Sequence, residues 1–125
     1  PLHYEKHFYD KLGKMNDEEA RCAQIIDGQK WVRRWVRNLE SKPDASFWLQ
    51  LGGARFYPDF VAELCDGRLL VVEYKGGDRI DNPDTLHKAK VGALWAERSN
   101  GRGVFLMVGV DDYIPKITAV GDATH

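Results

Sequence analysis

The chain has 125 residues, of which 43% are hydrophobic, so it can build one core and has little room for a second domain. Its formal net charge of −1 excludes a protein that attracts nucleic acids through total charge alone, so any phosphate binding must rest on a local site. No apolar run approaches the about 20 residues that span a bilayer, so we expect a cytoplasmic protein that is not in a membrane.

Two helices are expected in the first third of the chain. Asn16, followed by acidic residues with Glu19 at the third helical position, forms a capping box, and Gly28 is a typical helix end. Residues 31–39 carry apolar side chains at helical spacing, which predicts a second helix that ends before Pro43. Its basic residues are expected on a solvated helix face, with contact to DNA as the alternative: Arg33, Arg34 and Arg37.

The rest of the chain alternates between strands and helices. Strands are expected at 46–51, 56–64, 68–75 and 103–110, with a helix at about 82–99 that begins at Asn82-Pro83. We therefore predict an α/β fold, a small mixed β-sheet flanked by helices, over residues 1–125 as a single domain. The chain begins with Pro1, which suggests a fragment of a larger protein. The four tryptophans are expected in the core: Trp31, Trp35, Trp48 and Trp95.

Two charged residues end an otherwise apolar strand. Period-2 alternation places Leu69, Val71, Glu73 and Lys75 on one face of the 68–75 strand. A buried charge is costly unless it has a partner, so a carboxylate and an ammonium at this position indicate a site with a use for both. The alternative is that Glu73 and Lys75 are solvated charges on an edge strand, where they guard against aggregation. The preceding residues of the strand are apolar on both faces, which disfavours an edge position.

Asp59, in the preceding strand, is the candidate partner of Glu73. A strict two-residue turn would pair Phe60 with Glu73 and send Asp59 to the opposite face. A three-residue loop, Cys65-Asp66-Gly67, would instead place Asp59 opposite Glu73, with Gly67 at the left-handed position of the loop. Two carboxylates that close repel one another unless a cation lies between them, and hard oxygen ligands suit Mg²⁺ or Mn²⁺.

The ordered set resembles the PD-(D/E)XK nuclease superfamily. The residues that carry the likeness are Tyr57-Pro58-Asp59-Phe60-Val61 and, after a short hairpin, Val72-Glu73-Tyr74-Lys75. Together with Trp35-Val36-Arg37-Asn38-Leu39, they are similar to the nuclease region of type III restriction enzymes and related helicase-linked subunits. The likeness spans residues 16–110, although only about a dozen positions are distinctive.

The resemblance implies a restriction-endonuclease-like core and a Mg²⁺-dependent endodeoxyribonuclease. In that reading Asp59 and Glu73 bind the metal, the backbone carbonyl of Tyr74 is a further ligand, and Lys75 serves the attacking water. Glu19, or its neighbour Glu18, would add an acid from the first helix. The implied partners are DNA, less often RNA, and other domains or subunits of a restriction or helicase complex. ATP would act only through a motor domain outside this chain, which contains no phosphate-binding G-x-x-x-x-G-K-[ST] loop. The alternative is a nuclease fold that binds nucleic acid or a subunit without catalysis.

Overall fold

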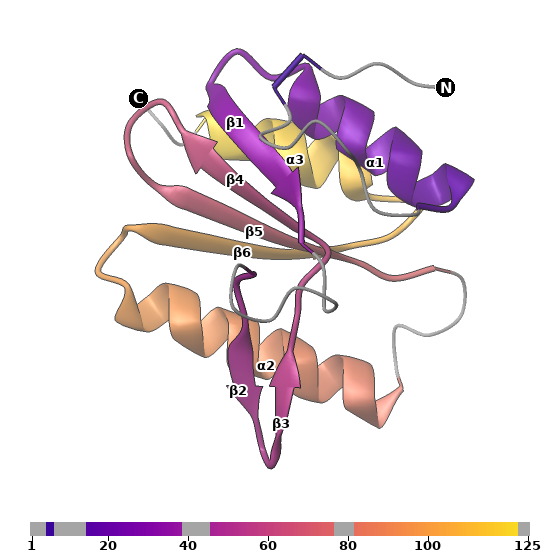
Figure 1. The fold of residues 1–125 in the computed structure, drawn as a ribbon, viewed down its shortest axis with the longest axis vertical. Helices are drawn as coiled ribbons and strands as arrows, with labels where there is room; N and C mark the ends of the chain where they lie inside the picture. The colour runs from indigo at the N-terminus through magenta and orange to yellow at the C-terminus, as the bar shows by residue number, and fades with distance from the viewer. Residues whose placement is uncertain (1–4, 7–14, 39–45, 77–81, 123–125) are drawn as a thin grey trace.

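A mixed four-stranded sheet lies between helices on both of its faces (Figure 1). The computed structural model describes residues 5–6, 15–38, 46–76 and 82–122. Within these ranges the strand order is β1-β4-β5-β6, with antiparallel pairing except between β5 and β6, and β2 and β3 form a separate hairpin. The elements are α1 (Asp17–Asp27), β1 (Val32–Arg37), β2 (Leu49–Leu51), β3 (Ala54–Phe56), β4 (Phe60–Leu64), β5 (Leu69–Tyr74), α2 (Pro83–Arg98), β6 (Gly103–Val108) and α3 (Tyr113–Asp122).

The core lies between the sheet and the pair α1 and α3. Side chains at alternate positions of the central strands point to this face, among them Phe60, Leu70 and Val72, and all three are fully buried. Ile26 of α1 and Ile117 of α3 complete the layer. The predicted α/β fold with a small mixed sheet flanked by helices is thus confirmed. Of the described helices, none has the length and apolar character needed to cross a membrane.

The predicted helix over residues 31–39 is wrong, because this segment forms strand β1. Val32 and Trp35 are both buried and three residues apart, a spacing that reads as one helical face. The actual cause is an irregularity in the pairing of β1 with β4 between Val32 and Arg34, where the strict alternation of the strand is lost. The extra residue in β1 therefore places two buried side chains three positions apart, which is also the spacing of a helix. Leu39 and Pro43 lie outside the described residues.

The first helix is confirmed at both ends. The Asn16 side chain accepts a hydrogen bond from the Glu19 N–H at 2.8 Å, and the Glu19 carboxylate accepts one from the Asn16 N–H at 3.2 Å. Helix α1 ends before Gly28, as expected. The predicted 56–64 strand is divided, since β3 ends at Phe56 and β4 begins at Phe60, with the donor-less Pro58 between them.

The β4–β5 hairpin takes the three-residue loop. The Leu64 N–H donates to the Arg68 carbonyl at 2.8 Å, and Gly67 has a φ of 92°. Phe60 is paired with Val72, so the next position outward places Asp59 level with Glu73. The register that brings the two acids together is therefore the one that the chain adopts.

Candidate active site

The centre of the site is the carboxylate pair Asp59 and Glu73. The Asp59 N–H donates to Glu73 Oε1 at 3.1 Å, and the Tyr74 N–H donates to Asp59 Oδ2 at 2.8 Å. Each carboxylate is thus held by a backbone amide of the other strand. Glu73 is only 5% exposed, although it is a charged residue type that is almost never buried without partners. The pair is built by the hairpin register and not by chance contact of flexible side chains.

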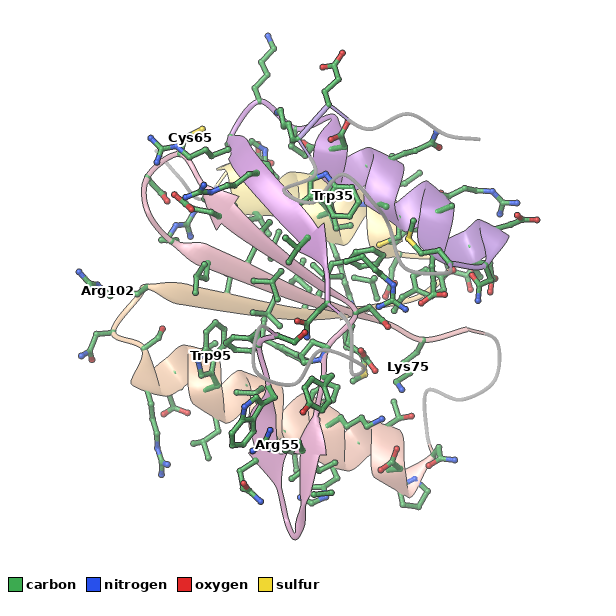
Figure 2. All side chains as sticks on the ribbon, viewed as in Figure 1. Trp35, Arg55, Cys65, Lys75, Trp95 and Arg102 are labelled. Atoms are coloured by element: carbon green, nitrogen blue, oxygen red, sulfur yellow. The ribbon has the colours of Figure 1, made fainter. Side chains whose placement is uncertain are left out.

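Lys75 contacts this pair from the end of β5. Its Nζ lies 3.0 Å from Glu73 Oε2, and the lysine side chain is 15% exposed. The Lys75 N–H donates to the Val108 carbonyl at 2.8 Å, which holds its backbone against β6. Figure 2 shows Lys75 pointing to the side of the sheet on which α2 lies. The expected proximity of Glu73 and Lys75 is confirmed.

Arg37 is a member of the site that the sequence reasoning placed elsewhere. Its Nη1 donates to the Asp59 carbonyl at 3.0 Å and to Asp59 Oδ1 at 3.2 Å, and its Nη2 lies 3.1 Å from Glu19 Oε2. The side chain is 14% exposed and not solvated as predicted. The pairing of Arg37 with Phe60 explains its position, since it sets the guanidinium beside the residue that follows Pro58. Only a correct strand assignment for β1 would have revealed it.

Glu19 caps its helix, as expected, and it also forms an ion pair with Arg37 that the sequence did not predict. One carboxylate oxygen caps its own helix, and the other forms the ion pair with Arg37. Glu19 is therefore linked to Asp59 through the Arg37 guanidinium, which forms an ion pair with each of the two carboxylates. Glu18 lies near the end of β5, because a Cβ added to Gly76 would sit 3.1 Å from Glu18 Oε2. Among the residues that the structure describes, no three acidic, histidine or cysteine side chains are grouped closely enough to hold a metal ion.

The electrostatic potential at the site is negative. Burial, followed by the charge of Glu73, raises the pKa of Asp59 to about 7, although Arg37 and the Tyr74 amide oppose the shift. Burial and the charges of Asp59 and Glu19 raise the pKa of the nearby Cys22 thiol to about 12. When Asp59 is ionised, the three carboxylates of the site exceed its two cations, Arg37 and Lys75, and this excess negative charge favours an added cation.

A buried asparagine positions the Pro58-Asp59 segment. Asn38 is 5% exposed, and its Nδ2 donates to the Pro58 carbonyl at 2.9 Å and to the Phe47 carbonyl at 2.7 Å. Its Oδ1 accepts from the Phe47 N–H at 2.9 Å, and its own N–H donates to the Asp59 carbonyl at 2.8 Å. This residue ties the segment before β4 to the end of β1. Asn38 lies in the segment 35–39 that resembles helicase-linked nucleases, but the sequence alone assigned no role to this residue.

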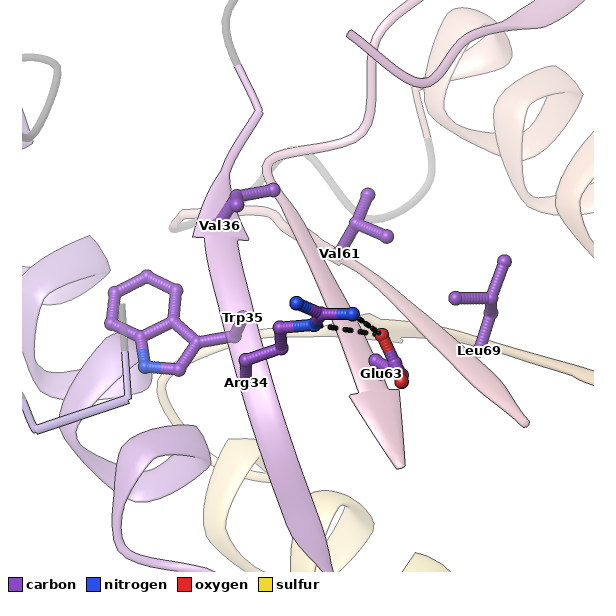
Figure 3. Close-up of a pocket in the computed structure, with 6 residues that line it drawn as sticks. All are labelled: Arg34, Trp35, Val36, Val61, Glu63 and Leu69. Atoms are coloured by element: carbon purple, nitrogen blue, oxygen red, sulfur yellow. Dashed lines mark hydrogen bonds and ion pairs between the residues drawn. The ribbon is translucent and has the colours of Figure 1, made fainter. Parts of the chain in front are cut away.

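A shallow pocket of about 240 Å³ opens elsewhere on the sheet, over β1, β4 and β5 (Figure 3). Apolar side chains and the Arg34–Glu63 ion pair line it: Arg34, Trp35, Val36, Val61, Glu63 and Leu69. None of these residues belongs to the carboxylate cluster. The candidate site is therefore a set of side chains at the ends of strands and not this pocket.

No family model, curated protein or solved structure matches this chain.

Proposed function

We propose that the chain is a metal-dependent nuclease domain that hydrolyses phosphodiester bonds in DNA. The observation that carries the proposal is the Asp59–Glu73 pair, buried at adjacent strand ends with the Lys75 ammonium 3.0 Å from Glu73. The resemblance to the PD-(D/E)XK superfamily, with its restriction-endonuclease-like fold, supports the same reading. It also suggests that the domain works within a larger ATP-dependent restriction or helicase-linked enzyme.

The residues present fit a hard divalent cation. Asp59 and Glu73 supply carboxylate oxygens, the ligand type that Mg²⁺ and Mn²⁺ prefer. Burial, followed by the charge of Glu73, raises the pKa of Asp59 to about 7, and Arg37 and Lys75 each contact one carboxylate of the pair. The Tyr74 carbonyl, which follows Glu73 on β5, is the proposed third ligand. Glu19 would join this set only if its ion pair with Arg37 opened.

The side chains have separate roles in the proposed reaction. A bound Mg²⁺ ion lowers the pKa of a coordinated water and stabilises negative charge on the phosphate. Lys75 orients the attacking water from the Glu73 side and stabilises the charge that develops on the phosphate oxygens. Arg37 holds Asp59 and Glu19 in fixed positions, and Asn38 holds the backbone that carries Asp59.

Metal-dependent cleavage tests the proposal directly. Supercoiled plasmid and single-stranded DNA are incubated with Mg²⁺ or Mn²⁺ and wild-type protein, Asp59→Asn, Glu73→Gln or Lys75→Met. Glu63→Gln is the matched acid control, because Glu63 lies on β4 in surface ion pairs with Arg33 and Arg34. The three site variants should lose cutting and the control should retain it. Equal cutting by every variant would assign the activity to a contaminant and end the proposal.

A second candidate is a nuclease fold that binds nucleic acid or a subunit without catalysis. The observation that favours it is Arg37, whose guanidinium already lies between Glu19 and Asp59 as a built-in cation. Thermal unfolding with Mn²⁺ separates the two functions. A metal present at 100 times its dissociation constant stabilises the native state by about 2.7 kcal/mol, and Asp59→Asn should abolish that gain. A binding-only domain should show no such gain in the wild-type protein.

A further inference from the structure

The outer face of the β2–β3 hairpin carries an aromatic and cationic surface. The Arg55 guanidinium carbon lies 4.3 Å from the ring centroid of Trp48, and Arg55 Nη1 donates to the Tyr57 hydroxyl at 3.4 Å. Trp48 is 37% exposed, although a core position was expected for it, and Arg55 is also exposed. We name Trp48, Arg55 and Tyr57 the stacking platform.

The hairpin has a buried face of its own, which these residues do not share. Leu49 and Phe56 are directly paired, and Phe56 is 3% exposed with its ring centroid 6.3 Å from that of Phe105 in β6. Because side chains alternate along a strand, the residues on either side of this pair point away from the core. The platform is therefore not needed to fill the interior of the domain.

The surroundings of the platform suit a polyanion. Residues 46–58 contain no acidic residue, and Arg55 is their only charged side chain. Lys88 of α2 contacts the other, buried face of the hairpin, with its Nζ 5.3 Å from the Phe56 ring centroid, and it is ion-paired with Asp84 at 3.3 Å. An exposed ring beside a guanidinium is the chemistry on which unpaired bases stack, and the guanidinium attracts the phosphates.

The platform also adjoins the candidate active site. Tyr57 and Asp59 are two residues apart, so their Cα atoms lie within about 7 Å of each other. Figure 1 shows that β3 leads from the outer part of the hairpin to the start of β4. Asp59 is the residue directly before β4, which begins at Phe60. Figure 2 shows Arg55 on the hairpin, on the side of the sheet toward which Lys75 points. A single strand of DNA bound to the platform would thus reach the carboxylates within a few nucleotides.

We propose that the stacking platform binds single-stranded DNA and feeds it to the Asp59–Glu73 site, so that the substrate is a single strand or a locally unpaired segment. The inference rests on the proposed function for its biological use, but binding itself requires neither metal nor cleavage. Duplex DNA keeps its bases stacked inside and presents no ring faces to the platform.

Binding in EDTA tests the platform without any contribution from metal or cutting. Fluorescence anisotropy is measured with a labelled single strand of about 15 nucleotides and with the corresponding duplex. The wild-type protein is compared with Trp48→Leu and Arg55→Gln. Arg33→Gln is the matched control, because it removes the same charge from a side chain that is 62% exposed on β1. Trp48→Phe retains a ring and should keep most of the affinity.

The platform predicts tighter binding of the single strand than of the duplex. Trp48→Leu and Arg55→Gln should weaken single-strand binding about fivefold or more, since stacking on one aromatic ring contributes at least that factor. Arg33→Gln should change it less than about twofold. Far-ultraviolet circular dichroism and melting temperature establish that each variant is folded. Equal affinity for duplex, a loss in Arg33→Gln as large as in Arg55→Gln, or unchanged binding by a folded Trp48→Leu would each overturn the inference.

Failure of the platform and failure of the proposed nuclease have different signatures. Metal-dependent cutting that needs Asp59, with no effect of Trp48→Leu on binding, would remove the platform alone. Single-strand binding that needs Trp48, with no metal-dependent cutting, would support the platform and remove the proposed catalysis.

Discussion

Replacement of Asn38 by alanine should destabilise the domain and displace Asp59. The substitution removes three hydrogen bonds made by a side chain that is 5% exposed, and it leaves the Phe47 amide and the Phe47 and Pro58 carbonyls without that partner. A net contribution of about 0.5–1.5 kcal/mol for each of the three bonds gives a loss of about 1.5–4.5 kcal/mol. That is a large part of the about 5–15 kcal/mol by which domains of this kind are stable.

Asn38→Asp is the isosteric companion variant. It keeps an acceptor for the Phe47 amide but turns oxygen toward two carbonyl oxygens that now accept from Nδ2. Its cost near neutral pH should equal or exceed that of Asn38→Ala, because a buried carboxylate with a single amide donor that faces two carbonyl oxygens is strongly disfavoured.

Guanidinium chloride unfolding, followed by tryptophan fluorescence and circular dichroism, measures both losses. Asn82→Ala is the matched control, since Asn82 caps α2 through one hydrogen bond to the Asp84 amide and should cost about 1 kcal/mol. Any Mn²⁺-induced stabilisation should also shrink in Asn38→Ala, because Asp59 loses its fixed backbone. A loss for Asn38→Ala no larger than that for Asn82→Ala would refute the positioning role of Asn38.

Three further predictions concern the rest of the domain. Gly92→Ala should destabilise by about 1–3 kcal/mol despite the higher helix propensity of alanine, because the new Cβ would lie 2.4 Å from the facing phenylalanine ring of β6; a gain in the unfolding free energy would contradict this. The pKa of Asp27 lies below its usual value: burial alone would raise it, but hydrogen bonds from the Trp35 indole and from backbone amides lower it. The stability that wild type has over Asp27→Asn should therefore be present above about pH 4 and fall as the pH drops through the lowered pKa, and a difference independent of pH would disprove this. Cys65 is exposed and Cys22 is buried with a pKa raised to about 12 by that burial, so a thiol reagent at pH 8 should modify one cysteine in the native protein and two after unfolding; fast reaction of both native thiols would count against the buried site.

Several features of this protein follow from neighbouring residues alone. Helix α1 begins and ends where the Asn16–Glu19 capping box and Gly28 predict, because a cap involves groups only a few positions apart. The start of α2 at Pro83 follows from the same kind of local chemistry. The position of Asp59 opposite Glu73 was one of the two registers that the sequence predicted. A three-residue loop with Gly67 in the left-handed region sets this register for the whole hairpin.

Other features depend on contacts between distant segments. The irregular pairing with β4 gave β1 the burial spacing of a helix, and only the partner strand distinguishes the two. That same pairing carries Arg37 and Asn38 to Asp59, across more than 20 positions of sequence. The spacing of apolar residues in a sequence indicates which side chains are buried, but it does not indicate which segments pack against them. The local sequence therefore determined the ends of α1 and the start of α2 and offered the register that pairs the acids, whereas the tertiary structure alone decided that register and brought Arg37 and Asn38 to Asp59.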